Sequence, residues 1–464
     1  LGFHARNGFV KKHLGDYKGV MSFSAIILAA GEGTRLKSKI PKPLHKIAGK
    51  PLIGWISDAL DAAGAANTYT VIPPYSKPLS DWLGEAPSII QDPPQGTGHA
   101  VLCCLDILKK KGDEPVIILF ADTPLVESST ISALVKQIKG GADICILGFK
   151  TPDPRGYGRL VCDEAGKLKA IIEDKDATER QRAISVVNSG IMCAKASVLC
   201  TLLPTLSPAN AQGELYLTDI VDLGVKAGMS ATHRLADENE LSGINNRAQL
   251  AKAEAIAQDR LRLAAMEAGA TLIDPSSVFL SADTLIEQDV VIEPHCVFGL
   301  GVHIGAGSII KSFSHIEDTI CGSSCIIGPY ARLRPGTILG DGVKIGNFVE
   351  VKNTVMAKGA KANHLTYLGD SEIGTNANIG AGTITCNYDG FHKSKTIIGS
   401  NAFIGSNSAL VAPVTIGAGA IIGAGSTITD SVGENALAIG RSPQSEKDGA
   451  AARFRDRQTR KKHK

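Results

Sequence analysis

The chain lacks the sequence patterns that are typical of membrane proteins, of secreted proteins and of proteins with structural metal sites. Its 464 residues contain no run of eighteen apolar residues and no apolar segment near the N-terminus, so neither a membrane span nor a signal peptide is expected. Its ten cysteines include no Cys-x-x-Cys pair, which is typical of reduced, mostly buried thiols in a cytoplasmic protein. The net charge of +3 is close to balance, so no nucleic-acid partner is expected.

The two ends of the chain are predicted to lie outside the folded domains. The first residue is Leu, whereas Met21 directly precedes the first clear strand, so residues 1–20 are interpreted as an extension outside the fold. Residues 448–464 form a basic C-terminal tail. Such a tail is either a solvated, partly disordered segment or an arm that helps to bind an anionic substrate.

A six-residue repeat dominates the second half of the chain. Branched aliphatic residues recur at every sixth position in two strict series, from Ile327 to Val351 and from Ile398 to Ile428, and glycine often follows them. This period is typical of a parallel β-helix, in which three hexapeptides form one triangular coil and the aliphatic residues stack inside. The β-helix is expected to begin near Leu272, with looser coils up to Ile326.

Two interruptions of the repeat are predicted to carry function. The first follows Val351 and lasts until Ile373, and the second follows Thr385 and lasts until Ile398. Excursions from a stiff scaffold often hold functional residues, and both interruptions contain reactive or adaptable polar side chains. The alternative is that both are variable surface loops.

The first half of the chain alternates short apolar strands with helical stretches. This pattern predicts a doubly wound α/β domain over residues 21–245, in which ligands lie beyond the carboxyl ends of the strands. A long helix over 246–268 then leads to the β-helix domain, 269–447. The expected strands cover residues 24–31, 68–73, 88–92, 115–122 and 142–149.

The loop after the first strand has the composition of an anion-binding loop. Gly31 and Gly33 allow backbone N–H groups to approach a ligand, while Arg35 offers a bidentate fork for phosphate and Lys42 a point charge. The loop is neither a Walker loop, because Gly-Lys followed by Ser or Thr is missing, nor a Rossmann fingerprint, because the third glycine is absent.

Polar residues follow several of the predicted strands. Gln91 follows one apolar strand, and Asp122 closes another. A carboxylate at the end of an apolar strand is costly to bury unless it is paired, so a cation is its expected partner; the alternative is a helix cap for the next segment. Further polar clusters at residues 155–160, 171–177 and 243–250 are suited to hydrogen-bonding a polyhydroxylated ligand.

Taken in order, these motifs closely resemble one bacterial family. It is the bifunctional N-acetylglucosamine-1-phosphate uridylyltransferase and glucosamine-1-phosphate N-acetyltransferase, and the resemblance spans about residues 21–447. The resemblance implies a Rossmann-like α/β nucleotidyltransferase domain with a mostly parallel sheet, a linking helix and a left-handed parallel β-helix of hexapeptide repeats. The segments that carry it are LAAGEGTRL, QGTGHA, RGYGRL, IIEDKDA, VNSG, GINNR, ARLRPG, GNFVEVKN, NHLTYLGD, NIGAGTITCNYDG and GENALAIGRSPQ.

The resemblance also implies the reactions and the assembly. Acetyl-CoA would acetylate glucosamine 1-phosphate, and UTP with Mg²⁺ would convert the resulting N-acetylglucosamine 1-phosphate into UDP-N-acetylglucosamine and pyrophosphate. The protein would be a homotrimer with acetyltransferase sites between its subunits. His364 would be the general base, because imidazole exchanges protons near neutral pH, and Arg35 and Lys42 would stabilise charge in the uridylyl step.

The remaining site residues follow from the same resemblance. Asp122 and Asn245 would hold the metal ion. Residues expected to contact the nucleotide or its sugar are Leu28, Ala29, Ala30, Gly31, Lys42, Gln91, Gly96, Thr97, Phe120, Ala121, Asp122, Gly158, Glu173, Asn188 and Asn245. In the second domain, the sugar phosphate would meet Arg334, Lys352, Tyr367 and Asn378. The acetyl-CoA groove would be lined by Ala381, Asn387, Tyr388, Ser406, Ala424 and Arg441.

Two other functions compete with this prediction. One is a sugar nucleotidyltransferase whose β-helix only assembles or regulates, which requires His364, Asn387 and Tyr388 to be idle. The other is a β-helix scaffold with an inactive first domain, which Arg35, Lys42 and Asp122 argue against. An assay of CoA release with glucosamine 1-phosphate discriminates the three.

Overall fold

The structure is a computed structural model that describes residues 22–31 and 33–462. The predicted extension 1–20 and the start at Met21 lie outside the described residues. The chain divides into two compact units between Ala257 and Gln258. This division falls inside one helix, α11 (Arg247–Glu267), which the sequence analysis had treated as a linker; the predicted domain boundaries stay predictions.

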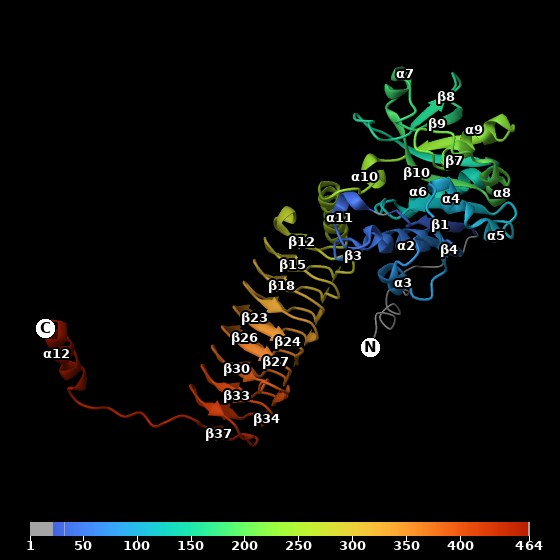
Figure 1. Cartoon of the computed structure of the whole chain (residues 1–464). Coiled ribbons are helices and arrows are strands. Elements are labelled where there is room, and N and C mark those ends of the chain that lie inside the picture. The colour runs from blue at the N-terminus through green and yellow to red at the C-terminus, as the bar shows by residue number, and fades with distance from the viewer. Residues whose placement is uncertain (1–21, 32, 463–464) are drawn as a thin grey trace. The chain divides into compact units, whose positions relative to one another are not determined.

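The first unit is built on a nine-stranded sheet (Figure 1). Strand β1 pairs in parallel with β4 and β6, and β7 pairs in parallel with β11, whereas β10 runs antiparallel between β6 and β7. The predicted α/β nucleotidyltransferase fold is therefore confirmed, but its sheet is mixed: β9 and β10 both run opposite to the other strands, which the sequence analysis did not anticipate. The strands are β1 (Ser24–Leu28), β4 (Asn67–Ile72), β5 (Ser88–Ile90), β6 (Pro115–Phe120), β7 (Ile144–Lys150), β8 (Arg159–Cys162), β9 (Leu168–Ile172), β10 (Val186–Lys195) and β11 (Ala231–Leu235).

Helices cover both faces of this sheet because the central strands are apolar on both sides. Alternate residues of β1 enter two different cores: Ile27 packs with α2 and α6, and Ile26 packs with α4, α8 and α9. A strand buried on both faces reads as a continuous apolar run, as SAIIL does. The longer helices are α2 (Leu52–Ala63), α3 (Lys77–Leu83), α4 (Thr97–Leu102), α6 (Ser128–Lys139), α8 (Ala196–Leu202) and α9 (Asp219–Lys226).

The shorter elements of the first unit lie in its connections. They are η2 (Thr34–Leu36), η3 (Lys42–Leu44), β2 (Lys46–Ile47), β3 (Lys50–Pro51), α5 (Leu105–Leu108), α7 (Glu179–Arg182), η4 (Leu203–Thr205) and α10 (Glu238–Leu241). The turns η2 and η3 carry Arg35 and Lys42, so two predicted functional side chains lie on short 3₁₀ turns directly after β1.

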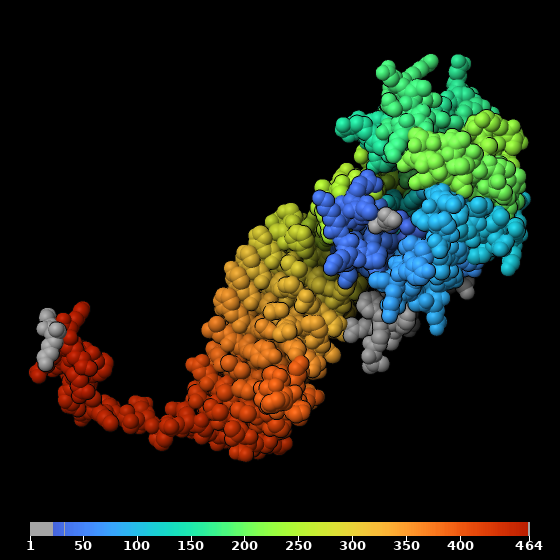
Figure 2. All heavy atoms as spheres, viewed as in Figure 1, coloured from blue at the N-terminus to red at the C-terminus, as the bar shows by residue number. Residues whose placement is uncertain are grey.

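The second unit is a parallel β-helix of three sheets, whose coils follow one another in sequence order (Figures 1 and 2). The first sheet holds β12 (Thr271–Leu272), β14 (Val291–Ile292), β17 (Ile309–Ile310), β20 (Ile326–Ile327), β23 (Lys344–Asn347), β26 (Lys361–His364), β29 (Asn378–Ile379), β32 (Phe403–Ile404), β35 (Ile421–Ile422) and β37 (Leu437–Ala438). The second holds β15 (Val297–Phe298), β18 (His315–Ile316), β21 (Arg332–Leu333), β24 (Glu350–Lys352), β27 (Tyr367–Gly369), β30 (Ile384–Cys386), β33 (Ala409–Val411) and β36 (Thr427–Ile428). The third holds β13 (Leu285–Ile286), β16 (His303–Ile304), β19 (Thr319–Cys321), β22 (Thr337–Leu339), β25 (Val355–Met356), β28 (Ser371–Ile373), β31 (Thr396–Ile398) and β34 (Val414–Ile416).

The prediction that the coils are interrupted between Val351 and Ile373 is wrong. Strands β25, β26 and β27 continue the coils through this segment, and their inward residues Met356, Ala362 and Leu368 are fully buried. The strict period was lost because a coil holds 17 or 18 residues, as the pairs Ile310–Ile327 and Ile327–Ile345 show, and because alanine replaces an aliphatic residue. The coils from Ile292 to Ile327 are not looser, since they hold 18 and 17 residues like the later ones, but the first coil, from Leu272 to Ile292, holds 20.

The second predicted interruption is a true excursion. Strand β28 pairs Ile373 with Ile398 of β31, so this coil holds 25 residues instead of 17 or 18. The added residues form a small loop closed by an antiparallel bridge between Tyr388 and Lys393. Its tip is exposed, with Phe391 87% accessible.

The tail contains helix α12 (Ala450–Lys462), whose described residues are nearly all exposed. Among the described residues, no helix combines the length and the apolar character that a membrane crossing requires.

Candidate functional sites

The carboxyl ends of the parallel strands in the first unit bring the predicted nucleotide residues to one edge of the sheet. Backbone hydrogen bonds join the segments there: Ala29 N–H donates to Val71 O at 2.8 Å, Gln91 N–H to Ile72 O at 3.0 Å, and Ala121 N–H to Leu28 O at 3.0 Å. The residues that follow β1, β5 and β6 are therefore held side by side, where ligands of such sheets bind.

Lys42 lies at the centre of the predicted phosphate site. Its Nζ forms an ion pair with Asp122 and donates to Asn245 Oδ1 at 2.9 Å, and Arg35 Nη2 donates to the same oxygen at 2.9 Å. Gly33 has a left-handed backbone, and a Cβ on it would lie 2.8 Å from Lys42 Cβ. Only glycine therefore allows the loop to pass this close to the lysine.

Asp122 does not cap a helix, which removes the alternative interpretation. Helix α6 begins at Ser128, its N-cap residue is Glu127, and no side chain caps it. Instead, the Asp122 carbonyl accepts from Ile244 N–H at 2.8 Å, which brings Asn245 next to the carboxylate.

The residues around Asp122 fit a divalent cation. The Asp122 carboxylate and Asn245 Oδ1 are both within hydrogen-bonding distance of one ammonium group, so their oxygens converge on a single point. Oxygen ligands of this kind suit Mg²⁺, which takes one or two protein ligands and completes its shell with phosphates and water. Among the described residues, no group of three or more His, Cys, Asp and Glu side chains is placed to hold a metal ion.

The predicted sugar residues Gly158, Glu173 and Asn188 also come together. Asn188 N–H donates to Gly158 O at 2.8 Å, and a Cβ on Gly158 would lie 3.3 Å from Glu173 Oε1. Burial raises the pKa of the Glu173 carboxyl, and a hydrogen bond from Thr218 Oγ1 at 3.1 Å opposes that shift. Thr218 is a further residue of this cluster, and sequence analysis missed it because no local motif marks a threonine that is distant in the chain.

Gln91, Gly96 and Thr97 form a turn beside the nucleotide edge. Gln91 Nε2 donates to Gly96 O at 2.9 Å, and Thr97 Oγ1 accepts from Leu217 N–H at 3.1 Å. Gly96 has a φ of 99°, and a Cβ there would lie 2.7 Å from the Leu215 carbonyl. The glycine is therefore required by the close approach of the 214–217 segment, whatever the ligand.

In the second unit, several predicted residues stack in one column along a corner of the β-helix. Backbone bonds link residues at equivalent corners: Leu365 N–H donates to Asn347 O at 3.0 Å, and Gly382 N–H to His364 O at 3.4 Å. The same pattern continues from Asn407 to Ala381 and from Gly425 to Ser406. The corner column thus consists of Asn347, His364, Ala381, Ser406 and Ala424.

His364 is oriented by its neighbour in the corner column. Its Nδ1 lies 2.8 Å from Asn347 Oδ1, and an amide oxygen can only accept. Nδ1 therefore carries the proton, and Nε2 keeps the free electron pair that a general base needs. Asn347 lies in the GNFVEVKN motif, but nothing in the sequence distinguished it from the rest of the repeat.

Of the residues predicted to hold the sugar phosphate, Lys352 and Tyr367 lie on the second sheet of the β-helix, and Arg334 directly follows its strand β21. Lys352 pairs with Gly369, and Arg334 Nη1 donates to Glu350 Oε1 at 2.7 Å. A Cβ on Gly369 would lie 2.5 Å from the Tyr367 hydroxyl and 2.7 Å from Asn387 Nδ2. The Tyr367 hydroxyl and the Asn387 amide therefore both lie close to Gly369, and a side chain at this position would displace one or both of them.

Asp370 connects the excursion to the coils. Its two carboxylate oxygens accept from Asn353 Nδ2 at 2.6 Å and from Asn387 Nδ2 at 2.5 Å. The acidic partner of Asn387 is a residue that the sequence analysis did not identify, although it is part of the NHLTYLGD motif.

Three predicted residues are not joined to this cluster within one chain. Asn378 lies on the first sheet, where it pairs with Lys361, and Tyr388 is 60% exposed on the excursion. Arg441 lies beyond the last coil, where its Cδ would be 3.7 Å from a Cβ on Gly425.

Three families of known proteins match separate parts of the chain. Residues 25–185 match the MobA-like NTP transferase domain, residues 395–430 match the bacterial transferase hexapeptide as six repeats, and residues 268–357 match the GMPPB C-terminal domain. The fold and these matches define a nucleotidyltransferase domain joined to a hexapeptide-repeat transferase domain.

Relatives over the whole length identify the family. The chain is 49% identical over 441 residues to the bifunctional protein GlmU of Xanthobacter autotrophicus, covering 94% of this chain and 97% of that protein. It is 47% identical over 438 residues to the protein of the same name from Azorhizobium caulinodans, covering 94% and 97%, and 48% identical over 446 residues to that from Zymomonas mobilis, covering 95% and 99%. The chain belongs to the bifunctional GlmU family.

Membership of this family confirms the central predictions. The chain is an enzyme with uridylyltransferase and acetyltransferase activities that makes UDP-N-acetylglucosamine, and its substrates include sugar phosphates and nucleotides. A divalent metal ion belongs to the nucleotidyltransferase chemistry. The two competing functions, a regulatory β-helix and an inactive scaffold, are therefore set aside.

Proposed function

We propose that the edge of the first sheet binds UTP and that the neighbouring cluster binds N-acetylglucosamine 1-phosphate. An oxygen of the sugar phosphate attacks the α-phosphorus of UTP, the bond to pyrophosphate breaks, and UDP-N-acetylglucosamine forms. The observation that carries this proposal is the convergence of Arg35, Lys42, Asp122 and Asn245 on one point at the carboxyl ends of the strands.

In this proposal the first unit acts by positioning and charge. Arg35 and Lys42 stabilise the negative charge that develops on the phosphates as pyrophosphate leaves. Mg²⁺, held by Asp122 and Asn245, would supply further neutralisation of the phosphates when bound. Leu28, Ala29, Ala30, Gly31, Gln91, Gly96, Thr97, Phe120 and Ala121 would surround the nucleotide, and Gly158, Glu173 and Asn188 would contact the sugar.

The second unit is proposed to acetylate glucosamine 1-phosphate, with His364 as the general base. Nε2 of His364 takes a proton from the sugar amine as the nitrogen attacks the acetyl-CoA thioester, and CoA leaves as the thiol. Arg334, Lys352, Tyr367 and Asn378 would hold the sugar phosphate. The corner column supports this assignment, because Ala381, Ser406 and Ala424 continue it from His364 toward Arg441 and offer an extended surface for acetyl-CoA.

We further propose that the chain works as a cytoplasmic homotrimer whose acetyltransferase site is shared between subunits. Asn378 and Tyr367 lie on different sheets of one chain, an arrangement that a neighbouring chain packed against one of these sheets would complete. The third sheet presents an outward apolar row that suits contact between copies, since solvent-facing apolar patches of this kind mark interaction sites. The apolar members of this row are Leu285, Ile320, Ile338, Val355 and Ile397, which are 39–56% exposed. His303 separates the first two members, and Glu372 separates the last two.

One mixing experiment tests the shared site. His364→Ala and Asn387→Ala chains, each inactive in acetyl transfer, are unfolded together, refolded and assayed for CoA release with glucosamine 1-phosphate. If the two residues come from different subunits, mixed trimers regain some sites without a lesion. Mixed trimers that form but release no CoA would place both residues in one subunit's site and overturn the proposal.

A further inference from the structure

The hairpin β8–β9 carries an ion pair directly behind the proposed sugar site. Arg159 pairs with Ile172 across the hairpin and with Val187 of β10, so Gly158 just before β8, Glu173 just after β9 and Asn188 within β10 lie side by side. Each of these three residues is therefore one position away from a paired residue. Their spacing depends on how firmly the open end of the hairpin is held.

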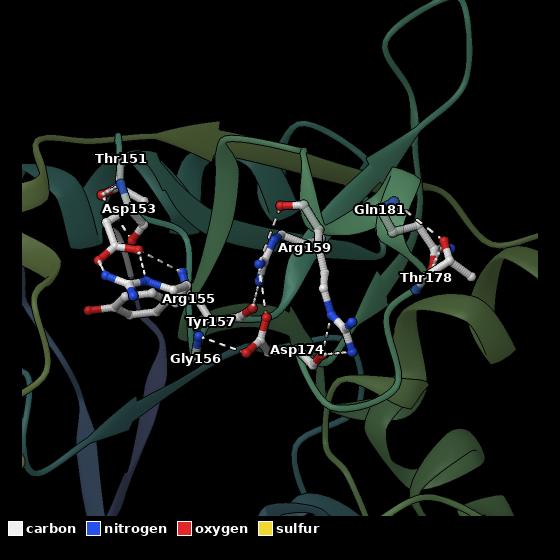
Figure 3. A network of polar contacts seen from close by, with 10 residues as sticks. Thr151, Asp153, Arg155, Gly156, Tyr157, Arg159, Asp174, Thr178 and Gln181 are labelled. Carbon is white, nitrogen blue, oxygen red and sulfur yellow. Dashed lines mark hydrogen bonds and ion pairs between the residues drawn. The ribbon is translucent and has the colours of Figure 1, made fainter.

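The Arg159 side chain is buried and contacts both sides of this open end (Figure 3). Its Nη2 donates to Asp174 Oδ1 at 2.9 Å, and its Nη1 donates to the Tyr157 carbonyl. The other carboxylate oxygen of Asp174 accepts from Gly156 N–H at 3.0 Å. The pair thus joins the backbone just before Gly158 to the residue just after Glu173.

Only the arginine of this ion pair is buried, since the Asp174 side chain is 32% exposed. Arg159 is only 1% exposed, and its Nε has no hydrogen-bond partner among the described residues. Desolvation of the buried guanidinium offsets part of its attraction to the carboxylate, so the ion pair contributes little net stability. What an apolar pair cannot do is fix the direction of the Tyr157 carbonyl and the Gly156 N–H.

We propose that Arg159 and Asp174 are positioning residues for the sugar phosphate in the uridylyl reaction. Neither touches the substrate. Together they set the separation between the Gly158 backbone and the Glu173 carboxylate, and thereby the affinity for N-acetylglucosamine 1-phosphate but not for UTP. This inference rests on the proposed function of the Gly158–Glu173–Asn188 cluster.

The Asp174→Asn enzyme tests the inference, because the substitution keeps the shape of the side chain and removes its charge. The KM for N-acetylglucosamine 1-phosphate is expected to rise about tenfold, as for the loss of a charged hydrogen bond. The KM for UTP, the kcat for uridylyl transfer and the acetyl-transfer rate of the same protein should stay within about twofold. Asp174→Glu, which restores the carboxylate at a partly exposed position, should bring the sugar-phosphate KM back toward that of the parent.

A matched control separates positioning from general stability. Asp143 forms an ion pair with Lys195 at 2.7 Å and precedes β7, whereas Asn188 pairs with Gly148 near the other end of that strand. Asp143→Asn should lower the melting temperature without changing either KM. If Asp174→Asn lowers only the melting temperature in the same way, or raises both KM values equally, the inference is wrong.

A further substitution distinguishes failure of this inference from failure of the proposed site. Glu173→Gln should raise the KM for the sugar phosphate if the cluster binds sugar. If Glu173→Gln leaves the KM for the sugar phosphate unchanged, the proposed sugar site is wrong. If Glu173→Gln raises this KM but Asp174→Asn does not, only the positioning role is wrong. If Asp174→Asn fails to fold, the same KM values are measured for Arg159→Lys. This substitution keeps the positive charge, but a lysine cannot contact Asp174 and the Tyr157 carbonyl in the way that the two guanidinium nitrogens do.

Discussion

The two units place functional side chains by different physical means. In the first unit, Arg35, Lys42, Asp122 and Asn245 come from segments far apart in the chain and are held by bonds between side chains. In the second unit, His364 and its neighbours occupy equivalent positions of successive coils and are held mainly by backbone bonds. A change in the first unit should therefore disturb several partners, whereas a change in the second should remain local.

The comparison is tested most strongly by Asp122→Ala. Uridylyl transfer should fall below detection, because the substitution removes the carboxylate of the proposed metal site and leaves Lys42 without its anionic partner. Acetyl transfer should be unchanged. Pyrophosphate release and CoA release measured on the same preparation give both rates, and equal losses of the two would indicate misfolding instead of a local effect.

His364→Ala is the matching change in the second unit. Removal of a general base typically costs about 10²–10⁴-fold in rate, so kcat for CoA release should fall by at least the lower figure. Uridylyl transfer and the melting temperature should stay close to those of the parent, because the imidazole is exposed and, among the described residues, bonds to Asn347 alone. A fall of less than about tenfold would exclude His364 as the base.

The pH dependence of the sugar-phosphate KM offers a smaller effect that is specific to the first unit. Burial raises the pKa of Glu173, so this carboxyl takes up its proton at a higher pH than an ordinary glutamate as the solution is acidified. If the carboxylate binds the sugar, the KM should then rise by up to about tenfold per pH unit below that pKa. Glu173→Gln should remove this pH dependence, and a parent enzyme with the same profile as the variant would contradict the assignment.

Asn347→Ala should produce the smallest change. The substitution removes one hydrogen bond that selects the tautomer of His364, a loss of about 1 kcal/mol or about fivefold in the acetyl-transfer rate. The rate of CoA release at saturating substrates is the measurement. An effect as large as that of His364→Ala would mean that Asn347 itself contacts the reacting groups.

The repeat made most of the second unit predictable from the sequence. Where the prediction was wrong, the reason lies in the packing of the coils. The aliphatic series from Ile398 to Ile428 is buried throughout, as expected. The interruption predicted after Val351 was wrong because Ala362 fills a small interior position that a search for large aliphatic residues overlooks. In the first unit, the strands and the strand-end residues Gln91 and Asp122 were found from local patterns. The antiparallel course of β10, and partners such as Thr218 and Asp174, depend on contacts between distant segments, which a single sequence does not display.

The regular stacking of coils makes the β-helix a ruler. Neighbouring coils are about 4.8 Å apart, so His364 and Ala424, which are three steps apart in the corner column, are separated by about 14 Å. Deleting a whole coil between them would shorten this length by one step and leave every side chain on its original face. Deleting a single residue would instead turn the following strand inside out, since side chains alternate along a strand. The length of any molecule that spans the column can therefore be measured by adding or removing one coil at a time.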